Sequence, residues 1–581
     1  MTKKQRGQNW RLNLILILFL AAGGFIVYRL FDLQVVHHHY YLALAQAQHQ
    51  SEEKIKAQRG KIYLTDKDQN SYLLATNREY YNLYAVPLEI QKLPNTQEET
   101  ETIAQKLEPL VPLDRQTIMA RLQKADDPFE PLAEKLTDEQ YETIKQLQLP
   151  GIYFYQDWKR WYPQGKLAAQ LVGFLGQTDQ GEVGQYGLEG YWQQVLAGQS
   201  GQSNQQKDAT GDWIGLTDQT ALPVIDGSNL YLTLDQNIQF MIEKKLGELL
   251  EKWQALSGSI IVMRPKTGEI LGMCSQPGFD PNQYATVPDI NVFLNPVVQS
   301  VYEPGSIFKP ITMSAGIDSG RVTPQTTFTD TGSVKIGGYT ITNAAGRSFG
   351  QSTMTNVLEQ SINTGIVFVQ QKIPKADFRE YIESFAFGRP LGIDLTGELP
   401  GNISNLKYER DIDYATIAFG QGIAVTPLQM INAIAAIANN GQLMRPFVVE
   451  KIVGPGGNEQ KNQPTVLSQP ISSQTASKLT AMLVSTVENG YDKVKVPGYY
   501  IAGKTGTAQI PDSQTGGYQE QYVHSFIGFA PAYDPQFIIL IKMDQPHGVR
   551  FASSSLAPTF GELTKFMLNY LEIPPDFSAG Q

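Results

Sequence analysis

Three short segments, far apart along the chain, combine hydroxyl, amine and amide side chains. Ser306 and Lys309 lie in the segment EPGSIFKP, Ser361 and Asn363 lie in SIN, and Lys504 begins KTGT. A serine hydroxyl becomes a nucleophile when a neighbouring base takes its proton, and a neutral lysine amine is such a base. These residue types therefore indicate acyl-transfer chemistry at Ser306.

The spacing of Ser306 and Lys309 fits the start of a helix. A Pro-Gly pair precedes Ser306, and Pro310 suits a first helical turn because its missing N–H costs least there. Residues three positions apart share one helix face. Backbone N–H groups at a helix start can stabilise an oxyanion. Burial and a second cation, such as Lys504, would lower the pKa of the Lys309 amine.

The segment from Lys504 to Thr507 is expected to form a strand that lines a cleft. Side chains alternate along a strand, so Lys504 and Gly506 would lie on one face and Thr505 and Thr507 on the other. Gly506 would let the backbone of a ligand approach closely. A second K-T-G triplet, at 266–268, falls in a predicted hairpin turn and is expected to be structural.

Each motif is weak alone, and their order carries the prediction. S-x-x-K occurs three times, beginning at Ser51, Ser306 and Ser404, whereas S-x-N occurs once. Ser361 follows Ser306 by 55 residues and precedes Lys504 by 143. The order S-x-x-K, S-x-N, K-T-G is the signature of penicillin-recognising serine acyltransferases.

The surrounding pattern predicts an α+β domain that positions these segments. Apolar strands are expected at 259–263 and 269–273, and a second hairpin is expected within 526–543. Asp235 is expected to cap a helix that runs to about Ala255, and 556–570 is expected to form a closing helix. Strand pairs at both ends with helices between them favour an antiparallel sheet packed with helices.

Composition excludes several other classes of protein. The 581 residues are 41% hydrophobic, which suffices for a large core. Cys274 is the single cysteine, so an intramolecular disulfide and a Cys-rich metal site are excluded. The net charge is −10, and because the first eleven residues contribute four positive charges and no acid, the rest sums to −14. An acidic body argues against nucleic-acid binding.

The apolar run from Leu12 to Tyr28 predicts a membrane anchor. Its 17 residues span about 25 Å as a helix, and extension to Phe31 would lengthen the span. Basic residues before it predict a cytoplasmic tail at 1–11, an anchor at 12–31, and a body across the membrane. A cleaved signal peptide and a buried soluble helix are the alternatives.

The chain resembles the class B penicillin-binding proteins, which are monofunctional peptidoglycan D,D-transpeptidases. The resemblance is carried by the three motifs, by FGQG and VTPLQ in the segment 419–429, and by Gly187-Leu188-Glu189 with Gly198. It implies an N-terminal pedestal or dimerisation-like module at 32–225 and a transpeptidase domain at 226–575. After Arg59-Gly60, the Asp-Arg and glycine usual in the family are absent from YLTDKDQ.

The resemblance implies a role for each catalytic residue. Ser306 would attack the penultimate D-Ala carbonyl of a stem peptide that ends in D-Ala-D-Ala, and Lys309 would be the base. Ser361 would relay a proton between Lys309, Lys504 and the leaving D-Ala. The amine of a second stem peptide would then take the acyl group and form a crosslink.

The resemblance also implies a substrate-binding set and no metal or organic cofactor. Asn363 would bind the peptide amide, and Thr505 and Thr507, flanking Gly506, would hold the terminal carboxylate. Backbone N–H groups of Ser306 and Thr507 would form the oxyanion hole. β-Lactams would acylate the same serine and stay bound.

The implied setting is the cytoplasmic membrane, with the catalytic domain outside. The implied partners are a SEDS-family glycosyltransferase and other wall-synthesis membrane proteins. The contexts of Ser306 and Lys504 favour the septal type over the elongation type.

Other functions remain open at this point. A serine D,D-carboxypeptidase or β-lactamase shares the three motifs but needs a water-activating group. Glu398 and Asn402 have the Glu-x-x-x-Asn spacing of class A β-lactamases, yet they lie in a Gly/Pro-rich segment that is expected to be structural. A scaffold or β-lactam sensor is a further alternative. A bifunctional glycosyltransferase is disfavoured because the pedestal shows no evident pair of catalytic carboxylates.

Overall fold

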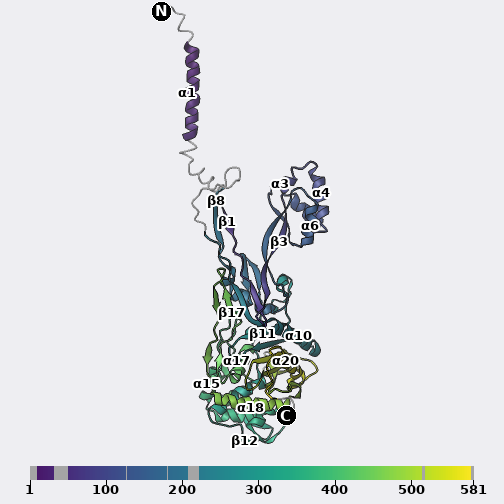
Figure 1. The fold of residues 1–581 in the computed structure, drawn as a ribbon, viewed down its shortest axis with the longest axis vertical. Coiled ribbons are helices and arrows are strands. Elements are labelled where there is room, and N and C mark those ends of the chain that lie inside the picture. The colour runs from purple at the N-terminus through teal and green to yellow at the C-terminus, as the bar shows by residue number, and fades with distance from the viewer. Residues whose placement is uncertain are drawn as a thin grey trace, which may run out of the picture. The chain divides into compact units, whose positions relative to one another are not determined.

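The computed structural model describes residues 9–31, 50–125, 127–179, 181–206, 222–512 and 517–577 (Figure 1). The chain divides into two compact units. One holds residues 1–57 and 198–226, and the other holds residues 58–197 and 227–581. Most of the expected tail at 1–11 lies outside the described residues.

The described residues of the smaller unit form one helix and one strand pair. Helix α1, Asn9–Phe31, exposes its apolar side chains from Leu14 to Tyr28. Strand β1, Gln50–Ile55, pairs antiparallel with β8, Gly201–Gln206. Within the described ranges, no helix combines the length and the mean hydropathy that crossing a membrane requires. The anchor expected at 12–31 therefore stays a prediction.

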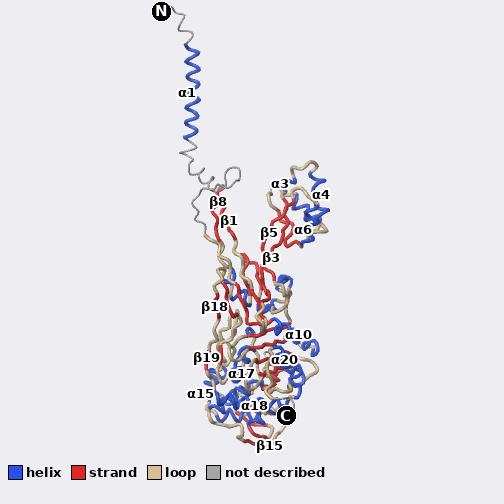
Figure 2. Tube along the Cα trace, in the orientation of Figure 1, coloured by secondary structure: helices blue, strands red, loops and turns tan. Residues whose placement is uncertain are grey.

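A long antiparallel ribbon dominates the N-terminal part of the larger unit (Figure 2). β3 pairs with β5 along its whole second half, and β4 pairs with β3 on the other side. Helices α3 to α6 cover this end of the ribbon and share with it a separate core of aliphatic side chains, such as Leu83, Ile103 and Leu132. The elements are β2 (Ile62–Thr65), β3 (Ser71–Ala85), α3 (Pro87–Ile90), α4 (Thr96–Leu107), α5 (Arg115–Leu122), β4 (Glu130–Leu136), α6 (Asp138–Gln146), β5 (Ile152–Trp161), α7 (Ala169–Val172), β6 (Phe174–Thr178), β7 (Gly181–Gln185), α8 (Gly187–Tyr191) and α9 (Gln193–Ala197).

One sheet joins segments from both sides of the expected boundary at 225/226. β9, Asn229–Asp235, pairs in parallel with β2 and antiparallel with β17, Val449–Val453. The order of the sheet is β18-β17-β9-β2-β3-β4, in which β18 is Glu459–Lys461, and β5 also pairs with β3. The pedestal segment and the later segment therefore share backbone hydrogen bonds rather than only side-chain contacts.

The second large sheet has five antiparallel strands in the order β11-β10-β22-β21-β20. Its strands are β10 (Ser257–Met263), β11 (Ile270–Gln276), β20 (Ala502–Pro511), β21 (Tyr518–Ala530) and β22 (Phe537–Asp544). Both strand pairs expected from the sequence are present. β20, which carries the K-T-G-T segment, is an edge strand that pairs only with β21 among the described strands.

Helices cover both faces of this sheet. Along β22, Ile539 and Ile541 pack in a core with α10 and α20, whereas Ile538 and Leu540 belong to the larger core that includes α17. Asp235 caps α10 as expected, because its carboxylate accepts hydrogen bonds from the N–H groups of Asn237 and Ile238. The covering helices are α10 (Gln236–Trp253), α12 (Lys309–Asp318), α17 (Pro427–Ala438), α18 (Ser473–Gly490), α19 (Ala552–Ser555) and α20 (Ala557–Tyr570).

Short elements between 296 and 468 complete the domain. They are α11 (Pro296–Gln299), β12 (Thr327–Asp330), β13 (Ser333–Ile336), β14 (Tyr339–Thr342), β15 (Gly350–Thr353), α13 (Met354–Glu359), α14 (Asn363–Lys372), α15 (Lys375–Ser384), α16 (Asp411–Ile417), β16 (Leu443–Met444), β18 (Glu459–Lys461) and β19 (Val466–Ser468). The mixed α+β architecture confirms the expected fold class.

Candidate active site

Ser306 lies in a tight turn that joins directly to a buried helix. A 3-10 turn, Gly305–Phe308, precedes α12, and Pro310 falls in the first turn of that helix as expected. Gly305 has a φ of 58°, and its N–H donates to the carbonyl of Gly420 at 3.0 Å. A Cβ atom on Gly305 would lie 3.0 Å from Cβ of Ala508. The Ser306 turn is therefore packed against β20.

The Lys309 amine is fully buried and held by three oxygens. Its Nζ donates to the carbonyl of Ser361 at 2.6 Å and to Oδ1 of Asn363 at 2.7 Å, and it lies 3.2 Å from Oγ of Ser361. The side chain is 0% exposed. The S-x-x-K and S-x-N motifs thus meet at one atom.

Lys504 reaches the same serine from the other side. Its Nζ donates to Oγ of Ser361 at 3.1 Å and to the carbonyl of Thr505 at 3.2 Å. Lys504 is 1% exposed. The sequence prediction that two distant lysines converge on one pocket agrees with this geometry.

The electrostatics of the site favour a neutral Lys309. Burial lowers the pKa of the Lys309 amine well below its ordinary value, and the positive charge of Lys504 lowers it further. A neutral amine has two N–H donors and one lone pair. The two carbonyl oxygens around Lys309 match the donors. The Ser361 hydroxyl accepts from Lys504 and can donate to the lone pair.

The loop between α13 and α14 presents Ser361 and Asn363. Ser361 has a left-handed backbone with a φ of 55°, which turns the chain sharply before α14 begins at Asn363. Nδ2 of Asn363 donates to the carbonyl of Thr342 at 2.9 Å. An amide nitrogen carries two N–H bonds, so Asn363 has a second donor for a substrate.

Gly506 lies in a place where the protein itself leaves no room for a Cβ atom. A Cβ atom there would lie 2.9 Å from the carbonyl oxygen of Pro304 and would collide with Oγ of Ser525. The close neighbour is thus the protein's own Ser306 turn. This internal packing is a reason for glycine that the sequence did not indicate, and the approach of a ligand backbone at Gly506 stays a prediction.

The hydroxyls of both threonines in the K-T-G-T segment have hydrogen-bond partners. Oγ1 of Thr505 lies 2.8 Å from the hydroxyl of Tyr491, and Oγ1 of Thr507 accepts from the N–H of Ala552 at 3.2 Å. Sequence reasoning missed Tyr491, because no motif includes it and it is 14 residues from Thr505.

Glu303 is a second residue that sequence reasoning left without a role. Its Oε1 accepts from the N–H of Gly422 at 2.8 Å, and burial raises the pKa of this carboxyl. Glu303 belongs to the EPGS segment, so its closeness to Ser306 in the sequence could have indicated that it contributes to the site. The bond joins the Ser306 turn to the FGQG segment.

The remaining candidate motifs take structural places. The carboxylate of Glu398 accepts from the N–H groups of Leu391, Gly392 and Ile393, at 2.6, 2.9 and 3.3 Å. It therefore stabilises a turn, as expected. Lys266 of the other K-T-G triplet pairs with Asp534 on the surface.

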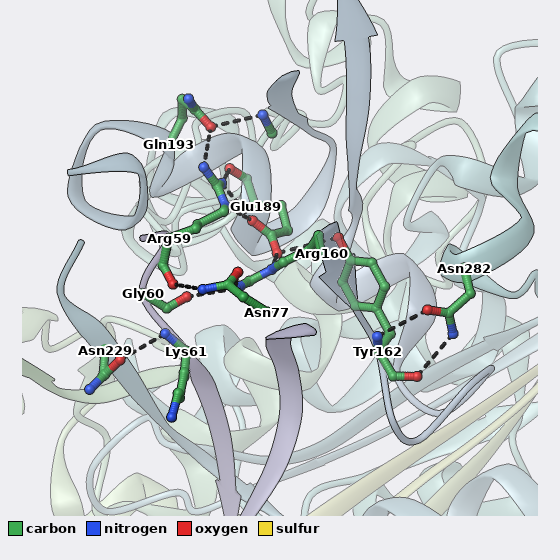
Figure 3. A network of polar contacts seen from close by, with 11 residues as sticks. Arg59, Gly60, Lys61, Asn77, Arg160, Tyr162, Glu189, Gln193, Asn229 and Asn282 are labelled. Atoms are coloured by element: carbon green, nitrogen blue, oxygen red, sulfur yellow. Dashed lines mark hydrogen bonds and ion pairs between the residues drawn. The ribbon is translucent and has the colours of Figure 1, made fainter. Parts of the chain in front are cut away.

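The resemblance motif around Glu189 forms a buried ion network in the pedestal (Figure 3). Glu189 is 0% exposed and bonds with Arg160 at 2.6 Å and with Nε of Arg59 at 2.7 Å. Burial alone would raise the pKa of Glu189, but the two guanidinium groups lower it overall. Arg160 also donates to the carbonyl of Gly60, and Tyr162 exchanges hydrogen bonds with Asn282.

Comparisons with known proteins agree with this architecture. The penicillin binding protein transpeptidase domain matches residues 258–565, and the penicillin-binding protein dimerisation domain matches residues 54–232. Stage V sporulation protein D of Bacillus subtilis is 32% identical over 570 residues, which cover 96% of this chain and 86% of that protein. Peptidoglycan D,D-transpeptidase FtsI of Escherichia coli is 28% identical, and the match covers 98% of this chain and 93% of that protein.

A solved structure is similar over nearly the same length. The crystal structure of penicillin binding protein 3 from Mycobacterium tuberculosis, complexed with aztreonam, has a TM-score of 0.67 and 26% identity, and it covers 91% of this chain and 99% of that chain. The transpeptidase match alone spans more than half of the sequence. As the resemblance predicted, the chain belongs to the class B penicillin-binding proteins, with a dimerisation domain followed by a transpeptidase domain.

Proposed function

We propose that this chain is a peptidoglycan D,D-transpeptidase that crosslinks stem peptides through an acyl-enzyme on Ser306. The buried Lys309 amine carries the proposal, because its lowered pKa makes it a base and its contacts join it to Ser361 and Lys504. The E. coli relative is named for the same activity.

In the acylation step, Ser306 Oγ attacks the carbonyl carbon of the penultimate D-Ala. Lys309 takes the hydroxyl proton, and backbone N–H groups of Ser306 and Thr507 stabilise the oxyanion. The C–N bond to the last D-Ala breaks. The leaving amine receives a proton through Ser361, to which Lys504 donates at 3.1 Å.

In the second step, the amine of another stem peptide attacks the Ser306 ester. A new amide bond forms, the ester C–O bond breaks, and Ser306 recovers a proton by the reverse route. During the earlier acylation step, Asn363 binds the peptide amide, and the Thr505 and Thr507 hydroxyls hold the terminal carboxylate, which then leaves with the last D-Ala. Gly506 keeps the strand that carries them against the Ser306 turn.

β-Lactams are proposed to acylate the same serine. Crystal structures of the M. tuberculosis relative are titled as complexes with aztreonam and with ampicillin. The contacts of Glu398 disfavour a hydrolase, because this candidate water activator accepts hydrogen bonds from three backbone N–H groups.

The decisive experiment is covalent labelling of the full chain with a fluorescent penicillin. Ser306→Ala should abolish labelling, whereas Ser404→Ala, which changes the serine of another S-x-x-K segment, should keep it. Labelling of the Ser306→Ala protein would refute the proposed nucleophile. Rapid nitrocefin turnover by the unsubstituted chain would favour a hydrolase instead.

We also propose that the chain is a single-pass protein of the cytoplasmic membrane. α1 would be the anchor at 12–31, with 1–11 in the cytoplasm, a pedestal at 32–225 and the catalytic domain at 226–575 outside. The apolar side chains exposed along α1 support this placement. Alkaline carbonate should leave the full chain in the membrane pellet and release a chain that lacks residues 1–31. Release of both would refute the anchor.

A SEDS-family glycosyltransferase and other wall-synthesis membrane proteins are the proposed partners. A septal role is preferred to an elongation role. A fluorescent fusion at mid-cell would support the septal role, and one along the side wall would support elongation. Failure of the chain to co-purify with any SEDS protein of its host would refute that partner.

A further inference from the structure

Each threonine of the K-T-G-T segment has a hydrogen-bond partner behind its hydroxyl. The Tyr491 hydroxyl lies 2.8 Å from Oγ1 of Thr505. The N–H of Ala552 donates to Oγ1 of Thr507 at 3.2 Å. The two partners come from different parts of the domain, one directly after α18 and the other from the start of α19.

The Tyr491 side chain is fixed in place by its surroundings. It is 8% exposed, and its ring meets that of Phe526 edge-on, with centroids 5.5 Å apart. Its backbone N–H closes the end of α18 by donating to the carbonyl of Val487 at 3.0 Å. The phenol oxygen therefore stays next to Thr505 instead of turning towards solvent.

Tyr491 is the better donor of this hydroxyl pair. A phenol is a stronger acid than an aliphatic alcohol, and its oxygen lone pairs are partly delocalised into the ring. Tyr491 therefore donates and Thr505 accepts. A threonine hydroxyl has a single O–H. With its oxygen occupied by Tyr491, Thr505 directs that hydrogen elsewhere, to a ligand that accepts.

The Thr507 hydroxyl is likewise left with its hydrogen to donate, because its oxygen accepts a hydrogen bond from a backbone N–H group. An N–H group can only donate, so the bond from Ala552 leaves the Thr507 hydrogen free to donate in turn. The turn that holds Ala552 is rigid, because the buried His524 ring lies 2.8 Å from Oγ of Ser555 and 3.2 Å from the carbonyl of Arg550. Both threonines are thus prepared as donors.

We propose that Tyr491 is a positioning residue that sets the preference of this site for a free carboxylate. It does so by making the Thr505 hydroxyl a donor. An ionised carboxylate only accepts hydrogen bonds, so two oriented O–H donors match it, whereas an ester at the same place accepts more weakly. The inference rests on the proposed function, in which Thr505 and Thr507 hold the carboxylate of the donor peptide or of a β-lactam.

The test compares a penicillin with its methyl ester on the full chain. The second-order acylation rate constant is measured for both, and their ratio reports the carboxylate preference. Tyr491→Phe should lower the rate constant for the free acid about tenfold, because the hydrogen bond from Thr505 to the charged carboxylate is weakened. The rate constant for the ester, which carries no charge there, should change less than about twofold. Tyr499→Phe is the matched control, since its hydroxyl bonds to the carbonyl of Ile573 at 2.6 Å instead.

A double substitution identifies the route of the effect. In a Thr505→Val background, Tyr491→Phe should leave the acid-to-ester ratio unchanged. An equal loss for both compounds in Tyr491→Phe, or no loss for either, would overturn the proposal. Failure of the proposed function would appear separately, as labelling that survives Ser306→Ala.

Discussion

Lys309 and Lys504 bond with one and the same hydroxyl, that of Ser361, at 3.2 and 3.1 Å. Both amines are almost completely buried. Burial lowers the pKa of Lys309, and the charge of Lys504 lowers it further. The serine oxygen accepts from one amine and can donate to the other. The Ser361 hydroxyl therefore connects Lys504 with Lys309, the amine whose lowered pKa favours its neutral form.

The charge of Lys504 should therefore control the pH range in which Lys309 works. Replacing Lys504 by Gln removes a positive charge, so the pKa of Lys309 should rise. Less of the neutral base is then present at a given pH, and the acid limb of the acylation rate should move to higher pH. The measurement is the rate of penicillin acylation across pH 5 to 10.

The quantity to compare is the midpoint pH of the acid limb and not the maximal rate, because Lys504→Gln also removes a hydrogen bond to Ser361. Lys266→Gln, in the surface K-T-G triplet, is the control and should leave the midpoint in place. A midpoint that stays fixed in Lys504→Gln would show that the two amines are not coupled.

Local spacing predicted the backbone around Ser306 and Lys309, a turn followed by a helix with Pro310 in its first turn. Ser306 and Lys309 are close in sequence, so a turn with a following helix places them together whatever the rest of the chain does. The meeting with Ser361 and Lys504 depends on packing over 55 and 143 residues, and only the order of the motifs indicated it. Tyr491 had no such pattern, because its place is decided by where α18 ends beside β20.

The secondary structure was predictable where a short local pattern, such as a hairpin turn or a helix cap, determines it. The hairpins and the Asp235 cap follow from local residue patterns and are present. The parallel pairing of β2 with β9 was missed, since the strands are about 170 residues apart and carry no local mark of each other. The packing of Gly506 against the Ser306 turn was also missed, because the two segments are about 200 residues apart.

His524 should make the protein less stable at mildly acidic pH. Burial lowers the pKa of this imidazole to about 4, whereas the unfolded chain has the ordinary value of 6.5. As pH falls below 6.5, the unfolded state takes up the proton first, so stability falls until pH 4, where the folded state is protonated too. The loss over this range is about 3 kcal/mol.

Urea unfolding at pH 7, 6, 5 and 4 measures this effect. The His524→Asn variant has no imidazole at this position to take up a proton. Its free energy of unfolding should therefore fall by about 3 kcal/mol less than that of the unsubstituted chain as the pH is lowered, even if it starts from a lower value at pH 7. His547→Asn is the control because His547 is exposed, and its pH dependence should equal that of the unsubstituted chain. Identical slopes in all three proteins would contradict the prediction.

Gly506→Ala should harm both stability and acylation. The new methyl group would press on the carbonyl oxygen of Pro304 and on Oγ of Ser525, so the strand or the Ser306 turn must shift. Overpacking of this kind costs about 1–3 kcal/mol. Chemical unfolding and penicillin acylation are the two measurements.

Gly456→Ala provides the comparison for Gly506→Ala. A Cβ atom there meets only Oδ1 of Asn458, at 3.8 Å, and the backbone is not left-handed. Gly456→Ala should change neither the stability to chemical unfolding nor the rate of penicillin acylation. If Gly506→Ala acylates at the normal rate and has normal stability, neither property requires the close approach of β20 to the Ser306 turn.

Glu189 should be the most costly charge in the pedestal to remove. Glu189→Gln keeps the shape of the side chain but leaves Arg59 and Arg160, which are 9% and 3% exposed, without their counter-charge. Removing one partner of a buried ion pair costs about 3–5 kcal/mol. Glu182→Gln, which removes a more exposed partner of Lys159, should cost about 1 kcal/mol or less. Thermal and urea unfolding of the two variants give the comparison, and equal losses would mean that the network in Figure 3 adds no more than a surface pair does.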